Sequence, residues 1–158
     1  EVTHVLKHPF DEDKALIVVK HSGPYLFEKY NPRTRILEKK GIGKTIKYDV
    51  HVVSANEQKL LIQSAIAFDK NEAKNSYIYW GDKNKINEDR EKYLFKGTGL
   101  MTFVDYLRIA ELSKLGIKKW VAEIDPGKDP SDFADFRRFE NETNQRTRTR
   151  KIPQLGKK

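Results

Sequence analysis

Ile46-Lys-Tyr-Asp-Val-His-Val-Val53 is the stretch that decides the fold. Aliphatic and aromatic side chains take every second position in it, which is typical of a β-strand with one buried face. The alternating series are Tyr48, Val50 and Val52 against Asp49, His51 and Val53. This segment therefore predicts a sheet in which one face is buried and the other carries polar groups.

The residues before this strand predict further β-structure. Ala15–His21 is a short apolar run, and a Gly23-Pro24 turn separates it from a second run at Tyr25–Tyr30. Asn31-Pro-Arg-Thr34 has the composition of a turn, so we expect Arg35–Lys39 to return as the second arm of a hairpin. The first half of the chain is therefore expected to be mainly antiparallel sheet.

Two helices are expected after this strand. Ser54 and Glu57 have the spacing of a capping box ahead of an apolar run, which predicts a helix from about Ala55 to Phe68. The second helix is expected to have Thr102 as its N-cap and to stop at Gly116.

Shorter elements complete the expected order. Strands are predicted at Ser76–Trp80, Lys92–Lys96 and Ile117–Ile124, and a short helix is predicted from Asp129 to Phe139. After Glu142 no apolar periodicity remains, which predicts a tail that is disordered when free.

Together these elements predict an α+β fold in a single domain, residues 1–142. Its expected architecture is a twisted, mainly antiparallel sheet packed by two principal helices. Residues 143–158 are expected to form a flexible, disordered basic C-terminal tail. The length of 158 residues agrees with one domain that buries a core of its own.

The composition narrows the class of protein. Apolar residues make up 37% of the chain, with seven Tyr and eight Phe, which is too many for a disordered protein. The chain has no cysteine, so disulfides and thiolate metal sites are excluded. It has no apolar run of the roughly 18 residues that a membrane span needs, so we expect a soluble protein without a membrane partner.

The N-terminus and the compartment give weaker expectations. Glu1 opens the chain without an initiator Met or a basic and apolar leader, from which we expect no signal peptide and a piece of a larger parent. A cytoplasmic or nuclear protein, or one delivered into the cytoplasm, would fit equally.

Positive charge is concentrated at the C-terminus. The last thirteen residues hold six of the 31 Lys and Arg and none of the 23 Asp and Glu, and so carry most of the net charge of +8. In an extended chain, Arg146, Arg148 and Arg150 would lie on one side, where their guanidinium groups suit phosphate oxygens. This pattern predicts contact with nucleic acid or another polyanion.

A second basic cluster lies on the expected hairpin and the loop after it. Residues 33–47 contain six cations and one acid, Glu38, and the aromatic residues Tyr25, Phe27 and Tyr30 lie on the adjoining strand. Cations beside aromatic rings are what single-stranded bases and their phosphates contact. The predicted nucleic-acid-binding residues are Arg33, Arg35, Lys39, Lys40, Lys44, Lys47, Arg146, Arg148, Arg150 and Lys151.

Few residues have the pattern of a catalytic site. His51 shares a predicted strand face with Asp49, and such a pair can support general acid–base cleavage of RNA without metal. Glu123 and Asp125 lie two apart at the end of a predicted strand, where paired carboxylates can bind a divalent ion. No cofactor is expected, and a divalent metal only if the protein is a nuclease.

Three functions therefore remain open. The first is a nucleic-acid-binding domain that makes mainly phosphate contacts through the basic hairpin and the cationic tail. The second is a small nuclease acting on RNA or DNA, such as the toxic module of a larger protein. The third is a protein-interaction or assembly module with an acidic partner. The oligomeric state is left open.

Overall fold

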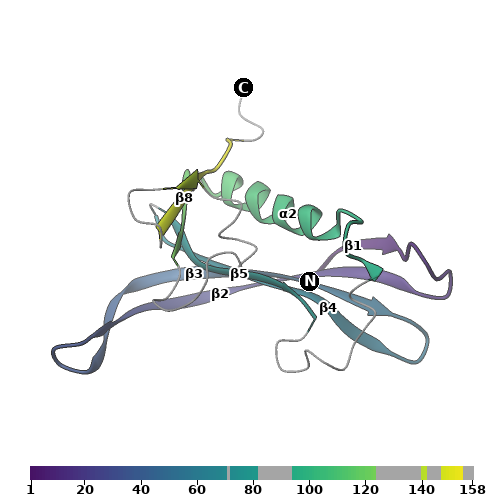
Figure 1. The fold of residues 1–158 in the computed structure, drawn as a ribbon, viewed down its shortest axis with the longest axis horizontal. Coiled ribbons are helices and arrows are strands. Elements are labelled where there is room, and N and C mark those ends of the chain that lie inside the picture. Colours follow the sequence, from purple (N-terminus) through teal and green to yellow (C-terminus); the bar gives the residue numbers. More distant parts are fainter. Residues whose placement is uncertain (71, 82–93, 124–139, 142–146, 155–158) are drawn as a thin grey trace.

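The computed structural model describes residues 1–70, 72–81, 94–123, 140–141 and 147–154. These residues form one eight-stranded sheet with the strand order β1-β2-β3-β4-β5-β6-β8-β7, and one helix covers part of it (Figure 1). The elements are β1 Val2–Lys7, β2 Ala15–Asn31, β3 Ile36–Val53, β4 Gln58–Phe68, β5 Ala73–Trp80, α2 Leu100–Lys114, β6 Lys119–Glu123, β7 Glu140–Asn141 and β8 Thr147–Lys151.

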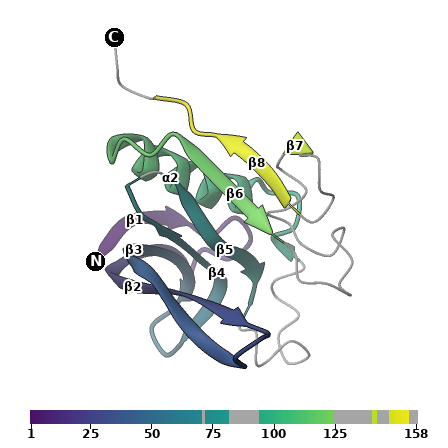
Figure 2. The same ribbon diagram turned by 90° about the vertical axis from the view of Figure 1, so that its left-hand side faces the viewer.

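The sheet combines an antiparallel meander with one crossover. Strands β1 to β5 each pair antiparallel with the next strand in the chain, so short turns are enough to join them. Strand β6 pairs parallel to β5 at Ala73 and Trp120, and parallel neighbours need a crossover connection, which here contains α2. Strand β8 then pairs antiparallel with β6, as Figure 2 shows.

The sheet is strongly curled because its ladders are interrupted by bulges. The register shifts between Val2 and His4 of β1, between Phe27 and Glu28 of β2, between Val50 and His51 of β3, and between Ala65 and Ala67 of β4. Each bulge bends its strand and increases the local twist. Four such shifts in neighbouring ladders give the curved sheet seen in Figures 1 and 2.

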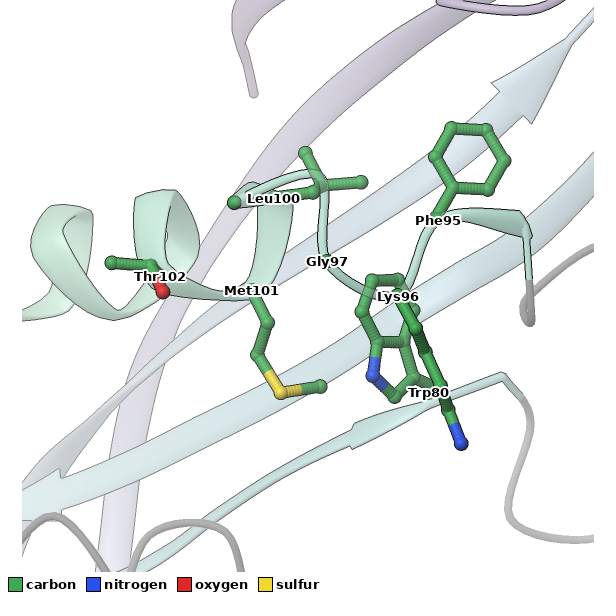
Figure 3. A pocket seen from close by; sticks show the side chains of 8 residues that line it. Trp80, Phe95, Lys96, Gly97, Leu100, Met101 and Thr102 are labelled. Atoms are coloured by element: carbon green, nitrogen blue, oxygen red, sulfur yellow. The ribbon is translucent and has the colours of Figure 1, made fainter.

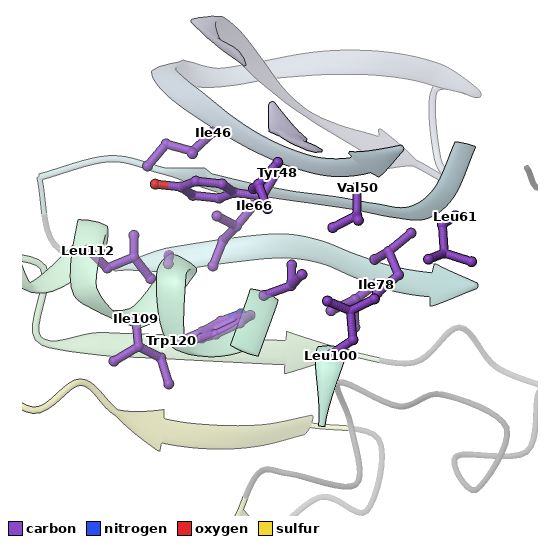
Figure 4. Close-up of a cluster of buried hydrophobic side chains, with 14 of the residues drawn as sticks. Ile46, Tyr48, Val50, Leu61, Ile66, Ile78, Leu100, Ile109, Leu112 and Trp120 are labelled. Carbon is purple, nitrogen blue, oxygen red and sulfur yellow. The ribbon is translucent and has the colours of Figure 1, made fainter. Parts of the chain in front are cut away.

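The core lies between α2 and one face of this sheet. On β3 the apolar series of the alternating segment points inward, while Asp49 and His51 point to the opposite face. Figure 4 shows these apolar side chains meeting those of α2 and β6. The fully buried members include Val18, Val50, Ile62, Ile66, Val104, Leu112 and Trp120.

A buried ion cluster fastens α2 to the strands around it. The Asp105 carboxylate accepts hydrogen bonds from the Arg108 guanidinium of its own helix and from the Arg150 guanidinium of β8, both at 2.8 Å. Arg108 also donates to the Tyr77 carbonyl of β5 at 3.2 Å, and it lies over the Trp120 ring, 4.7 Å from the centroid. Four elements therefore meet around one carboxylate.

The expectation of two principal helices is wrong, because the described part of the chain contains one. Residues 58–68 form β4, with Ser54-Ala-Asn-Glu57 as the turn before it, in which the Ser54 amide donates to the Glu57 carbonyl at 2.9 Å. From Leu61 to Phe68 every side chain of β4 except Gln63 is buried, so the apolar residues do not alternate strictly and periodicity alone cannot distinguish this run from a helix. The capping-box spacing coincided with a hairpin turn.

The disorder expected after Glu142 is also wrong for the residues that the structure describes there. Thr147–Lys151 is strand β8, paired along its length with β6, and Ile152 beyond it is buried. The alternation of Arg and Thr was the signal of a strand. Apolar periodicity is missing because the inward side chain at position 150 is an arginine that is neutralised by Asp105.

Several smaller expectations are corrected. Helix α2 begins at Leu100 after Gly99, whose φ of 85° ends the preceding turn, and Thr102 lies inside its first turn. Gly23-Pro24 is not a turn, because β2 passes through it. Of the strand expected at 92–96, the described residues are Leu94, which is helical, and residues 95–96, which form a turn. The helix expected at 129–139 lies outside the described residues.

Other expectations are confirmed. The turn at 31–34 joins the two arms of a hairpin, the Ser76–Trp80 strand lies within β5, and β6 falls inside the expected 117–124. Gly116, with a φ of 77°, ends α2 by donating its amide to the Ser113 carbonyl at 3.1 Å.

The Asp105 cluster predicts a large loss of stability on substitution. Asp105→Asn leaves the fully buried Arg108 without its counter-charge, so we expect the free energy of unfolding to fall by about 3–5 kcal/mol in urea titration. Lys40→Gln is the control, since it breaks the exposed 3.2 Å pair with Glu38 and should cost under about 1 kcal/mol. Equal effects of the two substitutions would contradict the structural role of the cluster.

The same cluster predicts a dependence on pH. Burial alone would raise the pKa of Asp105, but the charges of Arg108 and Arg150 outweigh it and hold the pKa below its usual value. A lowered folded-state pKa gives stability that is complete above the unfolded value of about 3.9 and is lost as the pH falls through the folded value. The difference in unfolding free energy between wild type and Asp105→Asn should be constant from about pH 7 to 5 and shrink below about pH 4.

Candidate nucleic-acid interface

The β2–β3 hairpin projects beyond the rest of the fold as an arm, defined here as residues 23–45. Figure 1 shows it extending past α2 at the lower left. Its strands stay paired from Gly23 and Thr45 at the root to Asn31 and Ile36 at the tip. A two-stranded ribbon of this kind is narrow enough to enter the major groove of a duplex.

The turn at the tip is held by hydrogen bonds of Asn31. Its side-chain carbonyl accepts from the Arg33 amide at 2.9 Å, its backbone carbonyl accepts from the Arg35 amide at 2.8 Å, and its side-chain amide donates to Glu38 at 2.7 Å. Arg35 adopts a φ of 57°, the left-handed conformation that closes such turns. Both arginines are exposed at this ordered tip.

The cations predicted on the hairpin are exposed in the structure. Arg33, Arg35, Lys39, Lys40, Lys44 and Lys47 all have exposed side chains. Lys29 of β2 is a further exposed cation of the same arm, and it was not among the predicted binding residues. The basic cluster was defined from residue 33 onward and so did not include Lys29. The predicted hairpin nevertheless already placed residue 29 on the other strand.

Acidic residues offset part of the positive charge of the arm. Glu38 pairs with Lys40 at 3.2 Å. The pKa of Glu38 is lowered by the hydrogen bond from Asn31 and by its contact with Lys40, so its carboxylate stays ionised. From Glu28 to Lys47 the arm and its root contain seven Lys and Arg against two Glu.

One face of the arm also exposes apolar side chains. Leu26 pairs with Ile42 and Tyr30 with Leu37 on the face that continues the helix-covered side of the sheet, and these four residues are 45–68% exposed. Tyr30 is therefore open to a stacking partner. Tyr25 and Phe27 are on the other face, where Phe27 is buried under Lys74, whose Nζ lies 4.7 Å from the ring centroid.

The predicted C-terminal site is only partly available. Arg150 is held by Asp105, so it serves the core, while Lys151 is exposed. Arg148 lies in β8, and Arg146 falls outside the described residues. Strands β4, β5 and β6 separate β8 from β3, so the two basic clusters do not lie on adjacent strands.

The face of the sheet opposite α2 carries an open depression of about 380 Å³ at the root of the arm. It is lined by polar side chains of β2, β3 and β4. The strand register sets their order, because His21 pairs with Lys47 and Asp49 pairs with Gln63. The lining residues are His21, Ser22, Gly23, Thr45, Lys47, Asp49 and Gln63.

Asp49 is the acid in the lining of this depression, and its carboxylate is partly buried. The Ser64 backbone N–H donates to its carboxylate, while Oδ1 is buried and has no hydrogen-bond partner among the described residues. Burial raises the pKa of Asp49 against the effects of this hydrogen bond and of the nearby His51, His21 and Lys47. Burial lowers the pKa of His51, and the Asp49 charge opposes that shift.

The structure therefore brings together one of the two expected catalytic pairs. Asp49 and His51 share the polar face of β3, as the alternation predicted. Glu123 ends β6 and Asp125 lies outside the described residues, so their geometry stays untested. Within the described ranges, no group of three or more His, Asp or Glu could hold a metal ion.

A second hollow, of about 350 Å³, lies where α2 begins. Figure 3 shows Trp80 of β5 facing Met101 of the helix, with Lys96 and Phe95 beside them. Trp80 and Phe95 flank in sequence the residues 82–93 that are not described. We assign no function to this hollow.

Comparison of the chain with protein-family models, with curated proteins and with solved structures found no match. Within the described residues, no helix is long and apolar enough to cross a membrane.

The close packing around Gly43, at the root of the arm, can be tested by substitution. A Cβ on Gly43 would lie 2.3 Å from the Phe68 carbonyl oxygen and 2.5 Å from the Phe27 ring. We expect Gly43→Ala to lower the free energy of unfolding by about 1–3 kcal/mol. Gly23→Ala is the control, because nothing lies within 4 Å of its Cβ, and it should be neutral or stabilise by up to about 1 kcal/mol. A neutral Gly43→Ala would contradict this packing of β2 and β3 against β4.

Proposed function

We propose that this protein binds nucleic acid through the β2–β3 arm, mainly by contacts to phosphates. The observation that carries the proposal is the row of exposed cations on a projecting, hydrogen-bonded ribbon. Cations on both strands and at the tip can meet the phosphates that border a groove, and the ribbon width suits the major groove of a duplex. Tyr30 adds an exposed ring that can stack on an unpaired base.

The role of the C-terminus in this proposal is smaller than the sequence indicated. Arg150 is held in an ion pair with Asp105, a carboxylate that it shares with Arg108, so its guanidinium group is committed to the core. Lys151 is exposed and can add affinity from a separate part of the surface. The arm therefore carries the proposal.

A protein partner with an acidic surface is the second candidate. The apolar pairs Leu26–Ile42 and Tyr30–Leu37, flanked by Lys39 and Lys44, favour it, because a contact area that joins apolar and cationic groups also suits an acidic, partly apolar protein segment. The two candidates differ in their dependence on salt and on these apolar side chains.

The proposal predicts a weaker salt dependence of binding when charges of the arm are removed. For Lys39→Gln/Lys44→Gln, the slope of log K against log salt should fall by about 0.7–0.9 for each phosphate that the variant no longer neutralises, or about 1.4–1.8 in total. Fluorescence anisotropy with a labelled duplex and a labelled single strand, at several salt concentrations, measures the slope.

The matched control is Lys7→Gln/Lys59→Gln, which removes two exposed cations at the end of the sheet far from the arm tip. Its slope should equal that of the wild type. An arm variant with an unchanged slope would contradict the proposal. If Leu37→Ser/Ile42→Ser lost binding while Lys39→Gln/Lys44→Gln kept it, the result would favour the protein partner.

A further inference from the structure

The depression at the root of the arm has the groups that a metal-independent transfer of a phosphoryl ester needs. Lys47, Asp49 and His51 follow one another on one face of β3, with about 6.6–6.8 Å between successive Cα atoms. His21 of β2 lies directly across from Lys47. His21, Lys47 and Asp49 therefore line the hollow, and His51 follows Asp49 on the same face of β3, next to the lining residues.

The two histidines differ in environment, as an acid and a base must. His51 is half-buried beside Asp49, and its burial lowers its pKa, which keeps its imidazole neutral at about pH 7 and able to accept a proton. His21 is exposed to solvent where it lines the depression. The charge of His21 also contributes to lowering the pKa of His51.

The neighbouring strands offer contacts for the rest of a nucleotide. Gln63, opposite Asp49, has amide N–H groups that suit a phosphate oxygen. Tyr79 pairs with Gln63 and Tyr77 with Ala65, and the two tyrosine rings stack with centroids 5.2 Å apart. Aromatic faces beside a phosphate-binding group are where an unstacked base is held.

We propose that this depression cleaves RNA by intramolecular transesterification, with His51 as general base and His21 as general acid. His51 takes the proton of a ribose 2′-hydroxyl, and the 2′-oxygen forms a bond to the adjacent phosphorus. The bond from phosphorus to the 5′-oxygen breaks, and that oxygen takes a proton from the His21 imidazolium. The products are a 2′,3′-cyclic phosphate and a 5′-hydroxyl end, and solvent restores the two protonation states.

Lys47 and Asp49 support these two proton transfers. The Lys47 ammonium, on the residue paired with His21, stabilises the negative charge that develops on the phosphate. Asp49 is a positioning residue, because its partly desolvated carboxylate stabilises the imidazolium that forms on His51. DNA lacks the 2′-hydroxyl, so the mechanism selects RNA.

This inference rests on the proposed function, since the arm would hold the strand whose ribose enters the depression. The test is incubation of the full chain with an end-labelled single-stranded RNA in EDTA, beside the same sequence as DNA and as 2′-O-methyl RNA. We expect only the RNA to be cut, with 2′,3′-cyclic phosphate ends. Cutting that EDTA abolishes, or that also consumes DNA, would overturn the mechanism.

Substitutions separate catalysis from binding. His51→Gln and His21→Gln should each slow cleavage by about 100- to 10,000-fold with unchanged RNA affinity. His4→Gln is the matched control, because His4 lies on the helix-covered side against Phe103, with ring centroids 5.4 Å apart, and its rate should equal the wild type. Equal thermal unfolding of all variants excludes loss of the fold as the cause.

Asp49→Asn tests the positioning role through the pH profile. The titratable groups on the same face of the sheet as His51 are Asp49 and Lys47 on β3, His21 on β2, and Tyr77 and Tyr79 on β5, while β4 contributes the uncharged Leu60 and Gln63. Of these, Asp49 and His21 act on the charge of His51. Without the Asp49 charge, the acidic limb of the rate profile should move to lower pH. An unmoved limb would overturn this role.

The two proposals fail in different ways. RNA that binds with a normal salt slope but stays intact overturns the cleavage and leaves the binding function standing. RNA that neither binds nor is cut overturns both proposals. Cleavage that persists in His51→Gln at the wild-type rate overturns the assignment of the base.

Discussion

The Asp105 carboxylate is the interaction on which the arrangement of the fold depends. It forms ion pairs with Arg108 within α2 and with Arg150 of β8, and Arg108 in turn reaches the backbone of β5 and the ring of Trp120. A buried charge left without its partner costs several kcal/mol, so the cluster permits few alternatives to this placement of α2 and β8. The cluster therefore ties α2, which lies in the crossover from β5 to β6, to strands β5, β6 and β8.

The long strands β2 and β3 serve the core with one half and solvent with the other. Toward the ends near Leu16 and Val52 they are buried under α2, and toward Asn31 and Ile36 they leave the fold as the arm. Gly43 lies at the transition, where Phe27 and the Phe68 carbonyl approach too closely for a side chain. A ladder of paired residues, interrupted by one bulge between Phe27 and Glu28, therefore connects the core to the exposed, cationic ribbon.

The sequence predicted the parts of this structure that follow from local pattern. The hairpin and its basic residues follow from the 31–34 turn and from alternation in β3, and the same alternation placed Asp49 and His51 on one face. The helix predicted over β4 was wrong because buried side chains follow one another from Ser64 to Phe68 without a period of two. The order in β8 was missed although Arg and Thr alternate there, because the strand is held through Arg150, whose partner Asp105 lies 45 positions earlier in the chain. The depression needed Gln63 and His21 from neighbouring strands, whose register no local pattern contains.

Register is also what couples the fold to the proposed chemistry. Because side chains on a strand alternate between faces, a shift of β3 by one residue would bury Asp49 and His51 under α2 and expose Tyr48 and Val50. Burial of the apolar series on β3 therefore determines that the polar series lies on the opposite face. The bulge between Val50 and His51 falls inside this segment and fixes its pairing with β4. Half-burying a carboxylate beside an imidazole costs solvation free energy. Hydrophobic burial on the opposite face of the sheet offsets this cost and holds the strand in place.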